Sequence, residues 1–146
     1  MADRTESSIT VSADPAEVMA VIADIDAYPD WNDEVKRVEV LSRHEDGDKR
    51  PLQVRFVLDA GMIKDDYVLS YAWEGDRAAS WTLVEAGMLT AMDGSYVLRD
   101  LGGGTTEVTY RLQVDVRIPM LGLMKRKAEK VVVDRALKGL KLRVEG

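Results

Sequence analysis

The fold is set by the segment Glu107–Glu145, EVTYRLQVDVRIPMLGLMKRKAEKVVVDRALKGLKLRVE, which joins a long strand pattern to a long helix pattern. Residues 107–118 alternate apolar and polar side chains, which is typical of a β-strand with one buried face. Pro119 ends that pattern, and apolar residues then recur with a helical period nearly to Glu145. The helix is therefore predicted to cover the apolar face of a sheet, with a buried stripe of Leu121, Met124, Ala128, Val131, Val132, Ala136 and Leu140.

Four shorter runs upstream of this segment repeat the period of two, and turn residues separate them. They are Arg50–Asp59, Asp66–Glu74, Ala79–Glu85 and Thr90–Arg99. Glu74–Asp76 is a hairpin signal, and Gly102–Gly104 is predicted to turn the chain before the last strand. That glycine run is not typical of a phosphate loop, because a strand follows it rather than a helix. The pattern favours an antiparallel sheet of consecutive hairpins.

The N-terminal region supplies one strand and two short helices. Glu6–Ser12 alternates like a strand, and Asp14–Pro15 then predicts a helix start at which the aspartate caps free amides. This helix is predicted to end near Asp26–Pro29, since the residue before a proline avoids the α region. A second helical turn over Asp30–Glu34 would place Trp31 against the fold. The order of elements predicts a single α+β domain over residues 1–146, in which a curved sheet closed by one helix leaves a cavity.

Composition narrows the class of protein. The chain has 46% hydrophobic and 32% charged residues, and no apolar run approaches the roughly 20 residues of a membrane span, so we expect a soluble globular protein. It contains no cysteine, which excludes disulfides, thiolate catalysis and sulfur-ligated metals. The N-terminus lacks the apolar core of a signal peptide, so we expect a cytoplasmic protein.

Charge is distributed unevenly along the chain. Residues 117–146 hold nine Lys or Arg against three Asp or Glu and carry +6, whereas the first 116 residues carry −12 and the whole chain −6. The acidic part argues against nucleic-acid binding. The basic helix suits transient contact with anionic lipid headgroups, although a solvated face explains the same residues and is the interpretation we favour. We expect a monomer or a weak dimer.

Aromatic side chains dominate the strand faces that are predicted to point inward. A buried tyrosine needs a hydrogen-bond partner, and several phenols on one concave face suit a ligand with carbonyl or hydroxyl groups. The alternative, an ordinary aromatic core whose hydroxyls reach backbone or water, stays equally open for each tyrosine. The candidate ligand-binding residues are Trp31, Phe56, Tyr67, Tyr71, Trp73, Trp81, Tyr96, Tyr110, Met124 and Ala128.

The candidates for catalysis are few: Glu85, Tyr71 and Tyr96. Glu85 shares parity with the inward aromatic residue of its strand, and a carboxylate inside the cavity would have the raised pKa of a general acid or base. A turn or bulge at Gly87 would instead rotate Glu85 to the surface, which is the position we favour. The only histidine, His44, lies in a charged stretch typical of a solvated turn. We therefore expect no catalytic triad, no metal site and no cofactor.

Several short motifs, taken in order, resemble one known family. They are Ala13–Val18 (ADPAEV), Tyr28–Trp31 (YPDW), Gly94–Leu98 (GSYVL), Gly104–Tyr110 (GTTEVTY) and the long helix after Pro119. Together they resemble the polyketide cyclase/dehydrase and lipid-transport branch of the START-like, helix-grip superfamily, and the chain looks most like its small actinobacterial members. The resemblance implies a seven-stranded antiparallel sheet wrapped around the C-terminal helix, with a ligand cavity between them.

The residues and the resemblance together leave three functional alternatives. Relatives include lipid and sterol carriers, so the leading hypothesis is the binding or transport of a lipid, isoprenoid or polyketide. The second is a polyketide cyclase or dehydratase in which Glu85, Tyr71 or Tyr96 moves protons. In the cyclases we would expect a cavity arginine, whereas Arg55, Arg99, Arg111 and Arg117 all fall on the polar parity, which weakens this alternative. The third is a protein-interaction module that uses the basic helix or the acidic sheet surface. Ile118–Gly122 is a candidate gate, because Pro and Gly flank the junction between strand and helix, and fixed packing of its apolar residues stays equally open.

Overall fold

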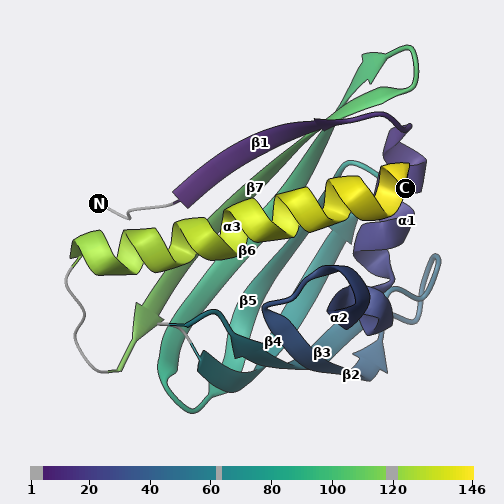
Figure 1. The fold of residues 1–146 in the computed structure, drawn as a ribbon. Coiled ribbons are helices and arrows are strands. Elements are labelled where there is room, and N and C mark those ends of the chain that lie inside the picture. The colour runs from purple at the N-terminus through teal and green to yellow at the C-terminus, as the bar shows by residue number, and fades with distance from the viewer. Residues whose placement is uncertain (1–4, 62–63, 118–121) are drawn as a thin grey trace.

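The computed structural model describes residues 5–61, 64–117 and 122–146 (Figure 1). All described strands join one seven-stranded antiparallel sheet in the order β1-β7-β6-β5-β4-β3-β2, and a long C-terminal helix packs on it, so the predicted α+β helix-grip fold is confirmed. The elements are β1 (Thr5–Val11), α1 (Pro15–Ala23), the 3-10 turn η1 (Ile25–Ala27), α2 (Tyr28–Trp31), β2 (Val35–Arg43), β3 (Pro51–Asp59), β4 (Lys64–Glu74), β5 (Ala78–Ala86), β6 (Leu89–Gly102), β7 (Thr105–Val116) and α3 (Gly122–Glu145).

The first strand pairs with the last, and the second strand forms the opposite edge of the sheet. The chain crosses from one edge to the other through α1, η1 and α2. Figure 1 shows α3 lying across the sheet, with α1 and α2 gathered near its C-terminal end. Apolar side chains from the sheet, α1 and α3 form one buried cluster, which lies between the sheet and α3.

Two details of the N-terminal helices differ from the prediction. Asp14 occupies the position before α1, but its side chain makes no capping hydrogen bond. The second helix begins at Tyr28 rather than at Asp30, and Tyr28 has α-helical angles (φ −53°, ψ −42°) although Pro29 follows it. Tertiary contacts outweigh the local preference here, because the buried Tyr28 hydroxyl donates a hydrogen bond to the carbonyl of Ile22.

The strand pattern was predicted for most of the sheet, but β2 was not assigned. The five predicted strands downstream of it fall on β3 to β7. The helix was predicted to open at Pro119, and that residue, like the rest of Ile118–Leu121 with most of the predicted gate, lies outside the described residues. No helix in the described part of the chain is both long and apolar enough to span a membrane.

The buried stripe of α3 is rotated relative to the predicted one. Ala128, Val132, Ala136 and Leu140 are buried as predicted, and Val133, Leu137 and Glu129 join them. Met124 is 45% exposed and Val131 is only partly buried, so the prediction was wrong for these two. The apolar pattern of the sequence did not reveal the true stripe, because one of its buried members is the charged residue Glu129. Glu129 is buried because two donors satisfy its carboxylate: Thr5 Oγ1 at 2.9 Å and the Val114 amide at 2.6 Å.

Polar contacts attach α3 mainly to β1 and β7. Besides Glu129, Lys125 pairs with Asp115 at 3.0 Å, and Lys141 donates to the Thr10 carbonyl at 2.6 Å. On the opposite side, the described residues give α3 one ion pair, in which Arg135 Nη1 lies 2.5 Å from Glu34 Oε1 just before β2. The two long sides of the helix are therefore held unequally.

Candidate functional site

An internal cavity lies between the sheet and α3. Its volume is about 40 Å³. Lining residues come from α2, from the segment between α2 and β2, from the six strands β2 to β7 and from α3. They are Tyr28, Asn32, Val35, Phe56, Leu58, Tyr67, Leu69, Tyr71, Trp81, Met92, Tyr96, Tyr110 and Val132. The cavity therefore lies at the predicted place, but it is small.

Strand register brings the aromatic rings of the cavity wall together. Phe56 is paired with Tyr67 across β3 and β4, and their rings stack with centroids 5.6 Å apart. Tyr96 is paired with Tyr110 across β6 and β7, and their rings meet edge to face at 4.7 Å. Cross-strand neighbours on one face of a sheet lie close enough for such contacts. The alternation of each strand thus builds a continuous aromatic wall.

A glycine on β6 makes room for the indole of Trp81 on β5. Gly94 is paired with Trp81, and a Cβ added to this glycine would lie 2.4 Å from two ring carbons of the indole. The indole can therefore lie against the backbone of β6, where it also contacts Tyr110 with ring centroids 5.5 Å apart. Gly94 is thus required for the position of Trp81 in the cavity wall.

Four phenols line the cavity without a protein partner. Among the residues that the structure describes, nothing forms a hydrogen bond with the hydroxyls of Tyr67, Tyr71, Tyr96 and Tyr110, whereas Tyr28 donates to the Ile22 carbonyl. Burial is the main cause that raises the pKa values of Tyr71 and Tyr96 well above the usual range for tyrosine, and the neighbouring phenols add to this shift. Burial also raises the pKa of Tyr110. These groups stay protonated at neutral pH, so the wall offers several unused hydrogen-bond donors.

Six of the ten predicted ligand-binding residues line the cavity: Phe56, Tyr67, Tyr71, Trp81, Tyr96 and Tyr110. The other four lie elsewhere. Trp31 packs edge to face on Tyr28 at 5.0 Å, with its Nε1 buried and without a described partner, and Trp73 lines a separate surface pocket. Ala128 is buried away from the cavity, and Met124 is exposed. The helix prediction failed for Met124 because the true stripe is rotated.

The structure places Glu85 on the surface, so it is no cavity carboxylate. Val68 pairs with Glu85 but the next residue, Leu69, pairs with Leu83, so β5 carries an extra residue at this point. Such a bulge shifts the alternation of side chains between the two faces, and the exposed position that we favoured is confirmed. Catalysis by Glu85 inside the cavity is therefore ruled out.

Sequence reasoning missed two polar residues near the cavity. Asn32 is buried and lines it, and its Oδ1 accepts a hydrogen bond from the amide of the buried Glu34 at 3.2 Å. Both follow the short α2, where no periodic pattern marks a buried side. His44 was expected in a solvated turn, but it is half-buried and its Nε2 lies 2.9 Å from the Tyr71 carbonyl. No group of three metal-binding side chains occurs in the described ranges.

Other bacterial proteins of known structure share this fold. A START superfamily protein from Mycobacterium smegmatis matches with a TM-score of 0.89 and 24% sequence identity, over 97% of each chain. A protein from Thermus thermophilus matches at 0.81 and 24%, over 98% of this chain and 97% of its own. The Zhui aromatase/cyclase from a Streptomyces species matches at 0.80 and 20%, over 99% and 94%. Identities this low show a common fold alone.

A family model decides the relationship. Residues 11–141 match the family described as polyketide cyclase / dehydrase and lipid transport. The chain belongs to this family. The resemblance predicted from its sequence motifs is therefore confirmed, although no curated protein matches the chain significantly.

In this member of the polyketide cyclase/dehydrase family, only a few kinds of side chain line the internal cavity. Its described wall holds phenols, one amide and apolar side chains, and neither a carboxylate, a histidine nor an arginine. Arg55, Arg99 and Arg111 instead form ion pairs on the sheet surface with Asp66, Glu107 and Glu6. The wall can therefore donate hydrogen bonds to an apolar guest, but it offers no strong base.

Proposed function

We propose that this protein binds or carries a hydrophobic small molecule, such as a lipid, isoprenoid or polyketide, between the sheet and α3. The observation that carries the proposal is the set of four cavity phenols without a described hydrogen-bond partner. These hydroxyls line the cavity space, and a guest with a carbonyl or hydroxyl oxygen would accept hydrogen bonds from them. The aromatic rings would supply apolar contact along the rest of the guest.

The proposed guest requires α3 to move. A cavity of about 40 Å³ holds roughly two or three water molecules, whereas pockets for drug-sized ligands measure roughly 300–1,000 Å³. The unequal attachment of α3 supports one direction of movement. Its contacts with β1 and β7 would act as a hinge, and the Arg135–Glu34 pair on the other side would open.

Native mass spectrometry and a fluorescent ketone test this function. The protein would be mixed with a bacterial lipid extract and weighed intact, and prodan, whose carbonyl accepts hydrogen bonds, would be titrated by fluorescence. We expect a bound lipid and saturable prodan binding. The double variant Tyr96→Phe, Tyr110→Phe should bind prodan about tenfold more weakly, since each lost hydrogen bond contributes about 0.5–1.5 kcal/mol.

Tyr28→Phe is the matched control for the phenol variants. It removes a cavity phenol whose hydroxyl already donates to Ile22, so it should lower the free energy of unfolding and leave prodan affinity unchanged. A protein that takes up neither the extract nor prodan contradicts the proposal. Equal loss of affinity in the control and in the double variant would show that the free hydroxyls have no special role.

A cyclisation reaction in the same cavity is the second candidate. The fold is shared with the Zhui aromatase/cyclase, and phenols kept protonated by burial can polarise a ketone. It stands second because the described wall lacks a base to remove a proton. Incubation with a poly-β-ketone thioester mimic tests it: faster formation of an aromatic product, lost in Tyr71→Phe, would favour an enzyme.

A further inference from the structure

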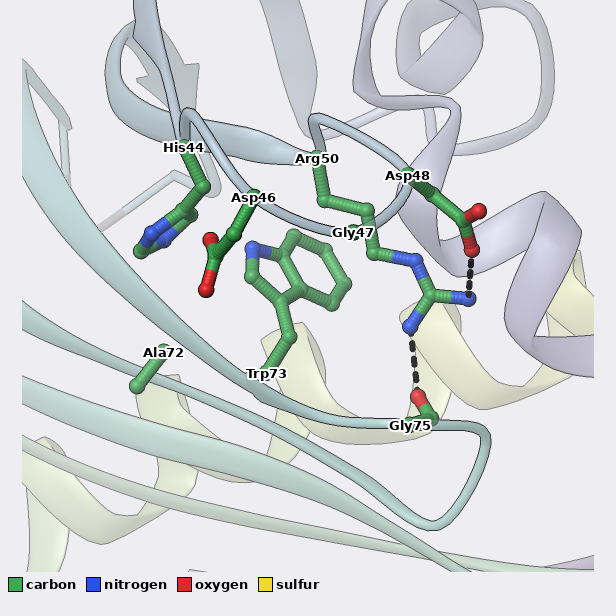
Figure 2. Close-up of a pocket in the computed structure, with 8 residues that line it drawn as sticks. All are labelled: His44, Asp46, Gly47, Asp48, Arg50, Ala72, Trp73 and Gly75. Carbon is green, nitrogen blue, oxygen red and sulfur yellow. Dashed lines mark hydrogen bonds and ion pairs between the residues drawn. The ribbon is translucent and has the colours of Figure 1, made fainter.

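A second hollow of about 420 Å³ opens on the surface between the β2–β3 hairpin and the end of β4 (Figure 2). Its lining is His44, Asp46, Gly47, Asp48, Arg50, Ala72, Trp73 and Gly75. The stacked rings of Tyr71 and Trp73, with centroids 5.3 Å apart, lie between this outer pocket and the internal cavity. The two spaces therefore share a wall but no described lining residue.

The outer pocket exists because the sheet opens at this point. The described β3–β4 pairing ends at Gln53 and Ser70. Beyond it, side chains replace the backbone ladder: His44 Nε2 lies 2.9 Å from the Tyr71 carbonyl, and Trp73 Nε1 donates to the Pro51 carbonyl at 2.7 Å. These bonds fix the imidazole and the indole, so the pocket is built from held side chains rather than from a loose loop.

Protein partners already use the hydrogen-bond donors of this pocket. Arg50 Nη1 donates to the Gly75 carbonyl at 2.5 Å, and its Nη2 lies 3.0 Å from Asp76 and 3.8 Å from Asp48. His44 Nε2 donates to the Tyr71 carbonyl, which can only accept, and this leaves Nδ1 as the other polar atom of the ring. The donors of Arg50, His44 and Trp73 that meet these partners are thus unavailable to a ligand.

The Asp46 carboxylate, unlike these donors and unlike Asp48, has no described partner. Asp46 forms no ion pair and no side-chain hydrogen bond with any residue that the structure describes, and Figure 2 shows its carboxylate beside the indole of Trp73 and the imidazole of His44. Among the lining residues, the carboxylates of Asp46 and Asp48 outnumber the single guanidinium of Arg50, which leaves one unbalanced negative charge in the wall. The Arg50 guanidinium, 5.5 Å from the Trp73 ring centre, shows that this ring already stabilises a cation.

From these observations we infer that the outer pocket binds a small organic cation, a protonated amine attached to an apolar body. The ammonium would pair with Asp46 and donate to His44 Nδ1, while the apolar body would contact Trp73. A bare metal ion fits poorly, since the described residues contain no group of three metal ligands and the space is far larger than an ion. This site is separate from the internal site that we propose for the apolar ligand.

Titration with 2-phenylethylammonium chloride tests the inference, followed by NMR at the Trp73 indole N–H and by calorimetry. We expect saturable binding that shifts the Trp73 signal. Asp46→Asn should weaken it about tenfold, equivalent to about 1.4 kcal/mol, and Asp46→Glu should restore part of it. The neutral analogue 2-phenylethanol should bind clearly more weakly than the amine.

Glu45→Gln is the matched control, because it removes the same charge from the same hairpin at an exposed residue outside the pocket lining. Its amine affinity should stay within about twofold of the wild type, because Glu45 does not line the pocket and solvent screens its charge from the amine. The inference is overturned by the absence of saturable binding, by equal losses in Glu45→Gln and Asp46→Asn, or by an alcohol that binds as tightly as the amine. Unchanged thermal unfolding of both variants would show that neither loss reflects misfolding.

Discussion

The internal cavity and the outer pocket, two of the hollows in this protein, have opposite polar chemistry. The internal cavity presents phenol hydroxyls that lack acceptors, and the outer pocket presents acceptors whose neighbouring donors are already in use. The cavity hydroxyls would donate to a guest, whereas the exposed Asp46 carboxylate would accept from one, so each hollow is complementary to a different class of guest. The comparison shows that the two spaces are distinguished by which hydrogen-bonding groups lack partners, donors in one and acceptors in the other, rather than by volume. The larger hollow is the more polar one, and the smaller has the wall suited to an apolar ligand.

Moving Trp81 in the wall of the internal cavity should have the largest effect on one hollow and not on the other. Gly94→Ala would place a methyl group about 2.4 Å from the indole, and overpacking of this kind costs about 1–3 kcal/mol. We expect the free energy of unfolding in urea to fall by about 2 kcal/mol and prodan binding to be lost. Amine binding at the outer pocket should persist at temperatures where the variant is folded.

Asp93→Ala, at the exposed position before Gly94 on β6, is the control for this strand. Its urea midpoint should stay close to that of the wild type. Retention of both prodan affinity and stability in Gly94→Ala would show that Trp81 does not shape the cavity.

Glu129 offers a contrast to both hollows, because its buried carboxylate meets two donors, Thr5 and Val114. Burial nevertheless raises the pKa of Glu129 above its usual value, although the hydrogen bonds oppose this shift. A folded-state pKa above the unfolded one makes the protonated form the more stabilising one. The contribution is therefore present at pH below the unfolded value and is lost as pH rises through the folded value.

Glu129→Gln tests that sign. The variant should gain stability relative to the wild type as pH rises from 4 to 8, measured by urea unfolding at each pH. Thr109→Val, at a partly buried position on β7, should leave the pH dependence unchanged. A stability difference between Glu129→Gln and wild type that is constant over this range would contradict the raised pKa.

Much of the fold was predictable because alternation and helical period follow directly from burial. The strand over 107–118 was predicted to within two residues at each end, and its inward residues Val108, Tyr110, Leu112 and Val114 are all buried. β2 escaped prediction. Its burial pattern contains five exposed positions and one fully buried residue, Val35, so the apolar alternation that marks the other strands is weak.

The candidate site was predictable only where a regular strand continued. Phe56, Tyr96 and Tyr110 reached the cavity because no register shift interrupts the pairing around them. The bulge beside Glu85 and the rotation of α3 at Met124 depend on contacts between distant segments, which no local pattern records. The outer pocket was missed for a similar reason: it depends on bonds from a hairpin loop to a neighbouring strand.

Ligand exchange at the internal cavity should respond to the ion pair on the open side of α3. Arg135→Gln removes the partner of Glu34, whose side chain is 5% exposed. If α3 opens on this side, prodan association and dissociation should both accelerate several-fold in stopped-flow measurements, with a smaller change in Kd. Lys130→Gln, which breaks an exposed pair with Asp134 on the same helix, should leave both rates unchanged. Equal acceleration in the two variants would place the opening elsewhere.

The smallest expected effect tests whether the two hollows are separate sites. Asp46→Asn should leave prodan affinity within about twofold of the wild type, and Tyr96→Phe should do the same for 2-phenylethylammonium, because distant sites without shared partners act additively. Tyr71 connects the two hollows through its stack on Trp73 and through the hydrogen bond from His44 to its carbonyl, and neither substitution removes these contacts. Saturation with either probe should therefore leave the Kd of the other unchanged, as measured by titration of one at fixed concentrations of the second. A reciprocal change in both Kd values would show that the stacked pair transmits binding, and the hollows would then be two halves of one amphipathic site.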